Sequence, residues 1–306
     1  MPEVMILMAT HNGGRFLAEQ LHSISCQSHT DWHLIISDDS STDKTKEIIG
    51  KFSHRNGQNR VTLLDGPEQG ATENFRSLIR RAELQGRYLA FSDQDDVWDE
   101  DHLARGLEVL MGLAKPLAIY GCRMRICDAD LNQIGMSPWP TRPLGFKNAL
   151  VQNVLSGNTM IMTPQAAQVL QSAEREVGPV PIHDWWAYQM ITGAGGVAHL
   201  DKLPHIHYRQ HGANVIGANR GIRTLPDRLG RHLRGGHRAW ALQNSAALMA
   251  TKSHLTAENI TVLQLFTEAL SAPLTGKIIG LRRSGIYYQS PQARAGFWLS
   301  VALGGF

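Results

Sequence analysis

The sequence has few cysteines, few aromatic residues and no long uninterrupted apolar run. Its 306 residues include Cys26, Cys122 and Cys127, and no two of them are spaced as a C-x-x-C pair. This scattered, odd set argues against a disulfide framework and a zinc ribbon, and it is typical of free thiols in a reducing compartment. No window reaches the ~20 apolar residues that a membrane helix needs. The short apolar N-terminus carries Glu3 and predicts a first strand rather than a signal peptide, so we expect a cytoplasmic chain.

Acidic residues are also missing from the C-terminal end of the chain. None follows Glu268, whereas Lys277, Arg282, Arg283 and Arg294 do. Upstream, one stretch with Asp227 as its single carboxylate contains Arg220, Arg223, Arg228, Arg231, Arg234 and Arg238. This stretch is either a solvated helix face or a contact for anionic lipid headgroups or a lipid-linked diphosphate, reinforced by Trp240 or by residues 297–299. Nucleic acid is not expected, because no aromatic-studded sheet or recognition motif accompanies the charge.

The first third of the chain alternates between strand and helix patterns. Apolar runs predict strands at 4–9, 33–37, 61–64 and 88–91, and residues at helical spacing follow each run. Such repeats predict an α/β fold with a Rossmann-like, mostly parallel sheet and helices on both faces. From Ile119 prolines separate shorter strands, two of them around Lys202, and beyond about Gly217 the pattern is helical. We therefore divide the chain into 1–125, 126–216 and 217–306.

Three polar clusters follow predicted strands, at the sheet edge where ligands of such folds bind. They are residues 10–12, Asp38-Asp39 and Asp93-Gln94-Asp95-Asp96. Carboxylates this close repel one another unless a cation is present, and oxygen ligands suit Mg²⁺ or Mn²⁺ shared with a substrate's phosphates. The alternative is a solvated acidic turn before the next helix. We assign Asp99, Glu100 and Asp101 to that helix N-terminus, which favours anions.

Six segments, taken in order, resemble a family 2 glycosyltransferase with the GT-A fold, near the bacterial rhamnosyltransferase-like members. The resemblance runs over roughly residues 4–215 and rests on Ala9-Thr10-His11-Asn12-Gly13, residues 37–43, Gly70 through Asn74-Phe75, residues 91–98, His183-Asp184-Trp185-Trp186 and residues 208–214. It implies a nucleotide-sugar-binding half at 1–125, an acceptor-binding and catalytic half at 126–216 and a helical basic extension at 217–306.

The resemblance also assigns roles to residues of this sequence. Donor binding falls to Thr10, His11, Asn12, Asp38, Asp39, Gly70, Asn74, Asp93 and Gln94. One carboxylate of the Asp38-Asp39 pair would accept from the imide N–H of a pyrimidine base, a charge-assisted hydrogen bond. The alternative is that this pair only shapes the turn before a helix.

The remaining roles concern the metal, the base and the acceptor. Asp95, with His211, would hold Mn²⁺ or Mg²⁺, and Asp184 would be the general base. Acceptor contacts would come from Gly157, Asn158, His183 and Trp185. Many members have Glu-Asp where this chain has His183-Asp184, which leaves the role of His183 open. Core packing for Trp185, a helix cap for Asp184 and a surface position for His211 are the simpler alternatives.

The function implied is an inverting, metal-dependent glycosyltransferase. It would move a sugar from dTDP-L-rhamnose or a UDP-sugar to a hydroxyl of a saccharide or lipid-linked saccharide acceptor in bacterial surface polysaccharide synthesis. Peripheral contact with the anionic inner face of the plasma membrane is a further hypothesis. A sugar nucleotidyltransferase is the second enzymatic reading, but residues 10–15 make a poor phosphate-binding loop. A non-catalytic nucleotide-sugar sensor is the third.

Overall fold

The first strand is apolar on both sides, and its alternate residues enter two different cores. The computed structural model describes residues 2–57, 59–212 and 236–306. In β1 (Val4–Thr10), Val4, Ile6 and Met8 join one buried cluster, whereas Met5 and Leu7 join the other. A strand buried on both faces is typical of a parallel sheet covered by helices.

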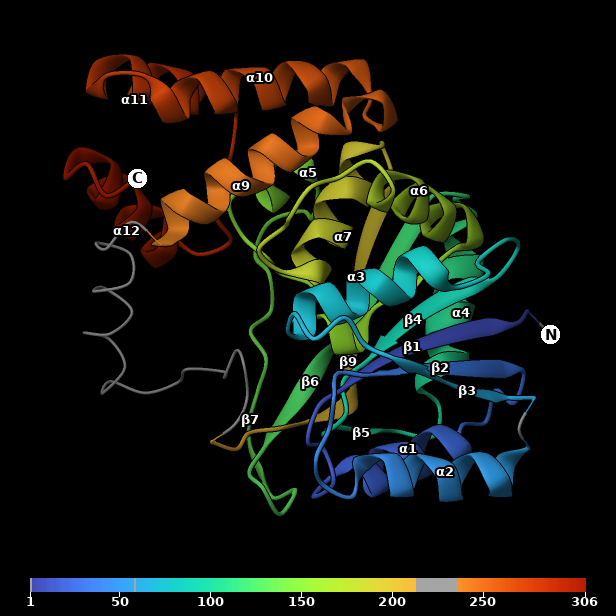
Figure 1. The fold of residues 1–306 in the computed structure, drawn as a ribbon. Helices are drawn as coiled ribbons and strands as arrows, with labels where there is room; N and C mark the ends of the chain where they lie inside the picture. The colour runs from blue at the N-terminus through green and yellow to red at the C-terminus, as the bar shows by residue number, and fades with distance from the viewer. Residues whose placement is uncertain (1, 58, 213–235) are drawn as a thin grey trace.

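The first half of the chain builds a parallel sheet, as its alternating pattern predicts. Its elements after β1 are α1 (Leu17–Ser25), β2 (Trp32–Asp38), α2 (Thr45–Asn56), β3 (Val61–Asp65), α3 (Ala71–Arg81), β4 (Tyr88–Ser92), β5 (Val97–Trp98) and α4 (His102–Leu113). The strands β3, β2, β1 and β4 lie side by side in that order, all parallel. Figure 1 shows α1 and α2 below this sheet and α3 above it.

The second half extends the same sheet with strands of both directions. It contains β6 (Ala118–Cys127), β7 (Gln133–Met136), α5 (Phe146–Ala149), the 3₁₀ turn η1 (Gly157–Thr159), β8 (Ile161–Met162), α6 (Pro164–Glu174), α7 (His183–Gly193) and β9 (Val197–Arg209). The strand order is β3-β2-β1-β4-β8-β6-β9-β5, and β7 pairs with β6. The mostly parallel arrangement therefore holds for the first half, and the whole sheet is mixed.

Where the sequence predicts two short strands around Lys202, the structure has the single strand β9. Cys122 of β6 pairs with Asp201, and the next residue, Arg123, pairs with Pro204. Lys202 and Leu203 fall between these pairs and make a bulge, a local irregularity that bends a strand without ending it.

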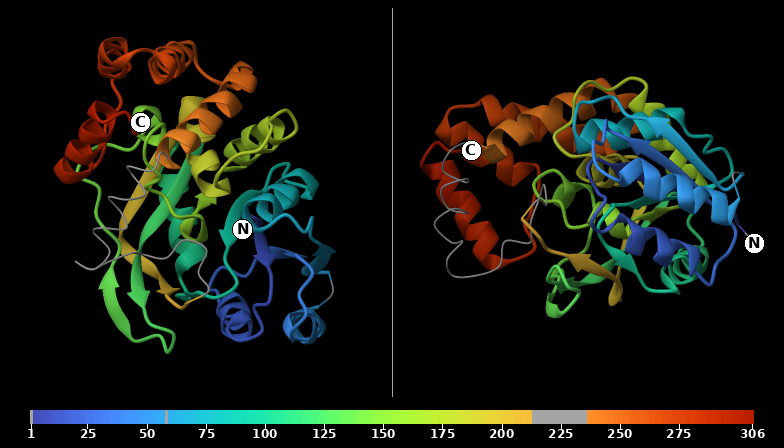
Figure 2. Two further views of the ribbon diagram at one scale, coloured as in Figure 1. Left: turned by 60° about the vertical axis from the view of Figure 1, so that its left-hand side comes forward. Right: turned by 60° about the horizontal axis from the view of Figure 1, so that its bottom comes forward.

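The chain after the described gap is helical and packs on the second half. It forms α9 (Gly236–Ala250), the 3₁₀ turn η3 (Lys252–His254), α10 (Ala257–Ser271), α11 (Leu274–Arg283) and α12 (Pro291–Ala302). Both views of Figure 2 show these orange to red helices gathered against the yellow-green elements. Trp240 of α9 meets Trp185 of α7 edge to face at 6.1 Å, and Asn259 of α10 donates to the Gly193 carbonyl at 2.9 Å. Among the described residues, we find no helix with the length and apolarity to cross a membrane.

A buried ion pair joins α3 to α6. Arg76 Nε donates to both carboxylate oxygens of Glu174, at 3.0 and 3.2 Å, and the Glu174 side chain is fully buried. Arg80 also reaches Glu174, at 3.3 Å. Burial raises the pKa of Glu174 even though Arg76 acts in the opposite direction. The pair therefore adds little net stability, but removing one partner leaves an uncompensated charge in the core.

We expect Arg76→Met to lower the free energy of unfolding by about 3 kcal/mol, measured by urea denaturation. Replacing both partners, Arg76→Met with Glu174→Met, should recover part of that loss because no buried charge remains. Lys51→Met, which breaks the exposed pair with Glu47 on α2, is the control and should change stability much less. An Arg76→Met variant as stable as that control would contradict a structural role for the buried pair.

Candidate active site

The polar clusters of the sequence meet at one edge of the sheet. Thr10 at the end of β1 pairs in register with Asp38 at the end of β2, and Thr10 Oγ1 donates to Asp38 Oδ1 at 2.9 Å. The Asp93–Asp96 segment follows β4, the other neighbour of β1. These strands are parallel, so their carboxyl ends, with the side chains beyond them, lie along the same edge.

Gln94 links the loop after β1 to the acidic segment after β4. Its side-chain amide accepts from the backbone N–H of His11 and donates to the carbonyl of His11, both at 3.0 Å. A Cβ on Gly13 would lie 2.3 Å from Gln94 Oε1, so this approach requires glycine there. Gln94 therefore fixes the spacing of two loops that the resemblance assigns to the donor.

Asp38 and Asp39 organise loops of their own. Asp38 accepts from the Ser41 hydroxyl at 2.6 Å and from the Ser41 N–H at 3.0 Å. Asp39 accepts from the backbone N–H groups of Glu68, at 2.5 Å, and Gly70, at 3.1 Å. The structure thus shows their loop-shaping role directly, while contact with a nucleotide base stays a prediction.

The remaining donor-site predictions occupy the same region. Asn12 has a left-handed backbone with φ 47°, and its side-chain oxygen accepts from the Thr42 N–H at 2.9 Å. Asn74 on α3 is buried and donates to the Ser37 carbonyl at 2.9 Å. Both therefore hold the loops at the ends of β1 and β2 in place.

The acidic segment carries three carboxylates with three different surroundings. Burial, the charge of Asp95 and the charge of Asp184 raise the pKa of Asp93 to about 8. Asp95 lies 2.8 Å from Nε2 of His211, which follows β9. Asp96 has no exposed surface, and it accepts from Asn158 Nδ2 at 2.5 Å and from the Arg209 N–H at 3.1 Å.

Asp184 lies in the first turn of α7 and is held by two donors from the segment before β8. Asn153 Nδ2 donates to Oδ1 and the Gly157 N–H donates to Oδ2, both at 2.9 Å. Burial raises the pKa of Asp184 to about 6, and these hydrogen bonds limit the rise. A carboxylate with this pKa is ionised at neutral pH and is a stronger base than an exposed aspartate.

The segment 153–158 therefore contacts both Asp184 and the acidic segment after β4. Asn153 and Gly157 hold Asp184, and Asn158 holds Asp96. A Cβ on Gly157 would lie 3.1 Å from both Asp184 Cβ and His183 Nε2, which leaves little room for a side chain. The sequence singles out Gly157 and Asn158 as acceptor contacts, and the structure gives each a hydrogen bond to an acidic side chain.

Two other predicted acceptor contacts are buried in aromatic surroundings. The His183 ring stacks on Phe75 at 3.9 Å and meets the edge of Phe91 at 5.3 Å. Burial lowers its pKa to about 3, so the ring is neutral. Trp185 donates from its indole N–H to the Ala149 carbonyl at 2.6 Å, and its ring packs on Trp240. Both side chains pack α7 into the fold.

Arg209 and Asn153 are site residues to which the sequence reading gives no role. The Arg209 side chain donates to the Asp95 carbonyl at 2.9 Å and to the Glu19 carboxylate at 2.5 Å, and its guanidinium lies over the Phe16 ring. Arg209 lies two residues before His211, inside the 208–214 motif of the resemblance, so this motif could have indicated a role for it. Residues 213 and 214 of that motif lie outside the described residues.

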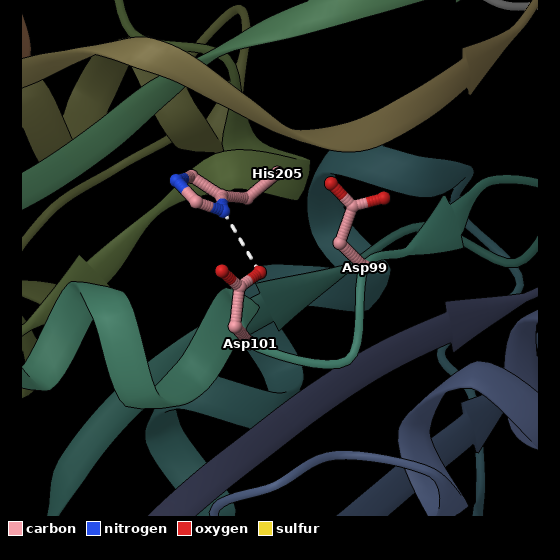
Figure 3. Close-up of side chains that lie close together, drawn as sticks. All are labelled: Asp99, Asp101 and His205. Atoms are coloured by element: carbon pink, nitrogen blue, oxygen red, sulfur yellow. Dashed lines mark hydrogen bonds and ion pairs between the residues drawn. The ribbon is translucent and has the colours of Figure 1, made fainter.

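A separate acidic group lies near the start of α4 (Figure 3). One ligand atom each of Asp99, Asp101 and His205 lies within 4.8 Å of the others, the one such group among the described residues. Asp99 already pairs with Arg125 at 2.6 Å and with His207 at 3.1 Å. A cation there would compete with these pairs, and above all with the permanent charge of Arg125.

Two solved structures share the fold of this chain. One is residues 1–349 of TarS from S. aureus in complex with UDP-GlcNAc, with a TM-score of 0.53, 14% identity and coverage of 94% of this chain and 93% of that chain. The other is the mannosyltransferase PcManGT from Pyrobaculum calidifontis in complex with GDP-Man and Mn²⁺, with a TM-score of 0.54, 16% identity and coverage of 99% and 85%. At these identities the likeness shows the fold alone, and that fold is the GT-A fold of glycosyltransferases.

Sequence comparison defines the family. Residues 5–178 match the family described as Glycosyl transferase family 2, so the chain belongs to this family and is a glycosyltransferase. The dTDP-rhamnosyl transferase RfbG of Shigella flexneri is 28% identical over 235 residues, which cover 73% of this chain and 78% of that protein. The predicted family, fold and enzyme class are therefore confirmed.

We expect Asn153→Ala to raise the pKa of Asp184 by about one pH unit, because the carboxylate loses a hydrogen bond that stabilises its charged form. The titration can be followed by NMR on protein labelled at aspartate carboxyl carbons, with Asp184→Asn identifying the resonance. Asn132→Ala, which removes a donor to Asp128 in an exposed turn, is the control and should leave the pKa of Asp184 unchanged. An Asp184 titration near 6 in both Asn153→Ala and the parent protein would contradict this account of the site.

Proposed function

We propose that the protein is an inverting, Mn²⁺- or Mg²⁺-dependent glycosyltransferase acting in bacterial surface polysaccharide synthesis. The observation that carries the proposal is the Asp184 carboxylate, which is held by two donors and lies close enough to the acidic segment to raise the pKa of Asp93. The rhamnosyl relative favours dTDP-L-rhamnose as the donor, with a UDP-sugar as the second candidate. The acceptor is a saccharide or a lipid-linked saccharide.

Asp184 acts as the general base. Its carboxylate takes the proton from an acceptor hydroxyl while that oxygen forms a bond to the anomeric carbon of the donor. On the opposite side, the bond from that carbon to the diphosphate oxygen breaks, and the nucleoside diphosphate leaves with the electron pair. A single displacement of this kind inverts the anomeric configuration. Asn153 and the Gly157 N–H keep the carboxylate oriented for this step.

The acidic segment fits a divalent cation. Asp95 and His211 offer an oxygen and an imidazole nitrogen 2.8 Å apart, a donor pair that suits Mn²⁺. Asp93 is raised in pKa by neighbouring carboxylates, and a cation beside it would relieve that repulsion. When bound, the metal would neutralise charge on the leaving diphosphate. Asp96 does not share this duty, because it has no exposed surface and Asn158 and Arg209 hold its oxygens.

The donor nucleotide would lie along the ends of β1 and β2. Each oxygen of Asp39 accepts one backbone hydrogen bond and keeps a lone pair that could accept from the imide of a pyrimidine. Thr10, His11, Asn12, Gly70, Asn74 and Gln94 hold or line the same loops and complete the proposed donor site.

Acceptor recognition centres on the 153–158 segment. Gly157 and Asn158 are buried, so they would serve the acceptor side by holding Asp184 and Asp96 in place. His183 and Trp185 support this site from the packed side of α7, since direct contact with an acceptor would require both rings to become exposed. A cytoplasmic location and contact with an anionic membrane complete the proposal. Of the arginines at 220–238, only Arg238 is among the described residues.

Asp184→Asn should bind the donor nucleotide normally and lose turnover by about 10³-fold or more, because the amide cannot take the proton. Turnover is measured as donor- and acceptor-dependent release of nucleoside diphosphate. The matched control is Glu258→Gln, the same kind of change at an exposed carboxylate on α10. Turnover in Asp184→Asn within tenfold of that control would rule out Asp184 as the base.

Asp95→Ala and His211→Ala should weaken metal-dependent nucleotide binding. In a thermal-shift screen with UDP, dTDP, GDP and CDP, each with and without Mn²⁺ or Mg²⁺, the parent protein should gain stability when nucleotide and metal are both present. Either variant should lose most of that gain and keep the melting temperature of the ligand-free protein. An Asp99→Ala variant that loses the gain instead would move the metal to the group around Asp99.

A further inference from the structure

Helix α12 has one face in the core and an opposite face that is apolar except for Gln292 and that no described residue covers. Phe297, Ser300 and Val301 are buried. At 3.6 residues per turn the outward side carries Ala295, Leu299, Ala302 and Leu303, all of them exposed and none charged. Leu299 is 51% exposed and Leu303, just past the helix end, is 64% exposed. Solvated helix faces are ordinarily polar, so this side is suited to an apolar environment.

Exposed cations border this apolar side. Arg294 lies on α12 itself, and Arg282 and Arg283 end the preceding helix α11. The Arg282 guanidinium lies 5.7 Å from the centre of the Trp298 ring, so the basic end of α11 adjoins α12. Ile279, one turn before Arg283, is 53% exposed. We call Ile279, Arg282, Arg283, Arg294, Leu299 and Leu303 the C-terminal face.

The charge of this face selects among possible partners. No acidic residue occurs in the sequence after Glu268, and among the described residues we find no ion pair of these three arginines with a carboxylate. A symmetric contact between two copies through the same patch would bring arginines near arginines, which is unfavourable. A bilayer with anionic headgroups over an apolar interior complements both features at once, because aliphatic side chains enter the interface while cations meet the headgroups.

We propose that the C-terminal face docks the protein on an anionic lipid bilayer. Helix α12 lies along the interface with Leu299 and Leu303 in the acyl boundary, and Arg282, Arg283 and Arg294 lie at the headgroups. Each contribution is modest, so binding is reversible and weakens as salt screens the charges.

Hydrogen bonds connect the chain between α11 and α12, next to the C-terminal face, to the segment that holds Asp184. Between α11 and α12, the Tyr287 carbonyl accepts from Asn148 at 3.0 Å and the Gln289 N–H donates to Gln152 Oε1 at 2.9 Å. Asn153, the next residue, donates to Asp184. Docking would therefore set the position of the acceptor side of the site relative to the membrane, so a lipid-linked acceptor could reach it. This consequence rests on the proposed function, whereas lipid binding itself does not.

The test is flotation of the full chain with phosphatidylglycerol–phosphatidylcholine vesicles and with pure phosphatidylcholine vesicles, at low and high salt. The parent protein should float with the anionic vesicles at low salt and remain behind with the neutral ones. Leu299→Asp with Leu303→Asp, and separately Arg282→Glu with Arg283→Glu, should reduce binding at least tenfold. Met111→Asp is the matched control, because Met111 is a 55% exposed apolar residue on α4 and should be replaceable without effect.

The outcomes distinguish a face that binds membranes from an interface between protein copies. Circular dichroism and a nucleotide thermal shift equal to those of the parent show that each variant is folded. Failure of the parent to bind anionic vesicles, or binding unchanged in both double variants, overturns the proposal. A concentration-dependent dimer that the same variants dissociate, with no lipid binding, would make the face a protein interface and would also overturn it. Release of nucleoside diphosphate with a lipid-free acceptor is measured separately, so loss of the docking proposal leaves the proposed transferase activity intact.

Discussion

The conformation of the segment after β4 depends on the carboxylate of Asp96, which has no access to water. Asp96 is enclosed, and burial together with the charges of Asp95 and Asp93 raises its pKa well above the usual value. Within the described part of the chain, two donors offset that cost, Asn158 from the turn before β8 and the Arg209 N–H at the end of β9. An unpaired buried carboxylate is strongly destabilising, so the three segments have to arrive together. The order of the acidic segment therefore follows from the folding of the second half of the chain.

The two halves of the sheet contribute different residues to the candidate active site. The parallel half brings the ends of β1, β2 and β4 together, as its topology requires, and Gln94 and Asp39 then fix the loops beyond them. The mixed half supplies Asp184, the 153–158 segment and the end of β9. Strand β8 has two residues, yet it pairs with both β4 and β6 and makes one continuous sheet of the two halves. Asp184 and the acidic segment are thus both held by hydrogen bonds from residues 153–158.

Much of this could be predicted from the sequence, because the signals were local. Apolar runs followed by helical spacing fixed the four parallel strands, and the acidic residues stood directly after one of those runs. The environment of Asp184 could not be predicted in the same way, because Asn153 is 31 residues away and no spacing connects them. The burial of His183 was also not predicted, whereas core packing was one of two alternatives for Trp185. Nearly every residue of α7 is buried, so its pattern has no polar face from which to tell which side chains meet a ligand. The single strand β9 was obscured by its bulge at Lys202.

One anchor of Asp184 is a backbone N–H rather than a side chain. Every residue except proline has this group, so the orientation of the carboxylate depends little on the identity of the side chains at 154–156, although Gly157 itself has almost no room for a substituent. Val154 and Leu155 pack in the core, so Ser156 is the position at which the side chain can change while the carboxylate keeps its orientation. This anchor therefore tolerates sequence change in a way that the second one, the Asn153 side chain, does not.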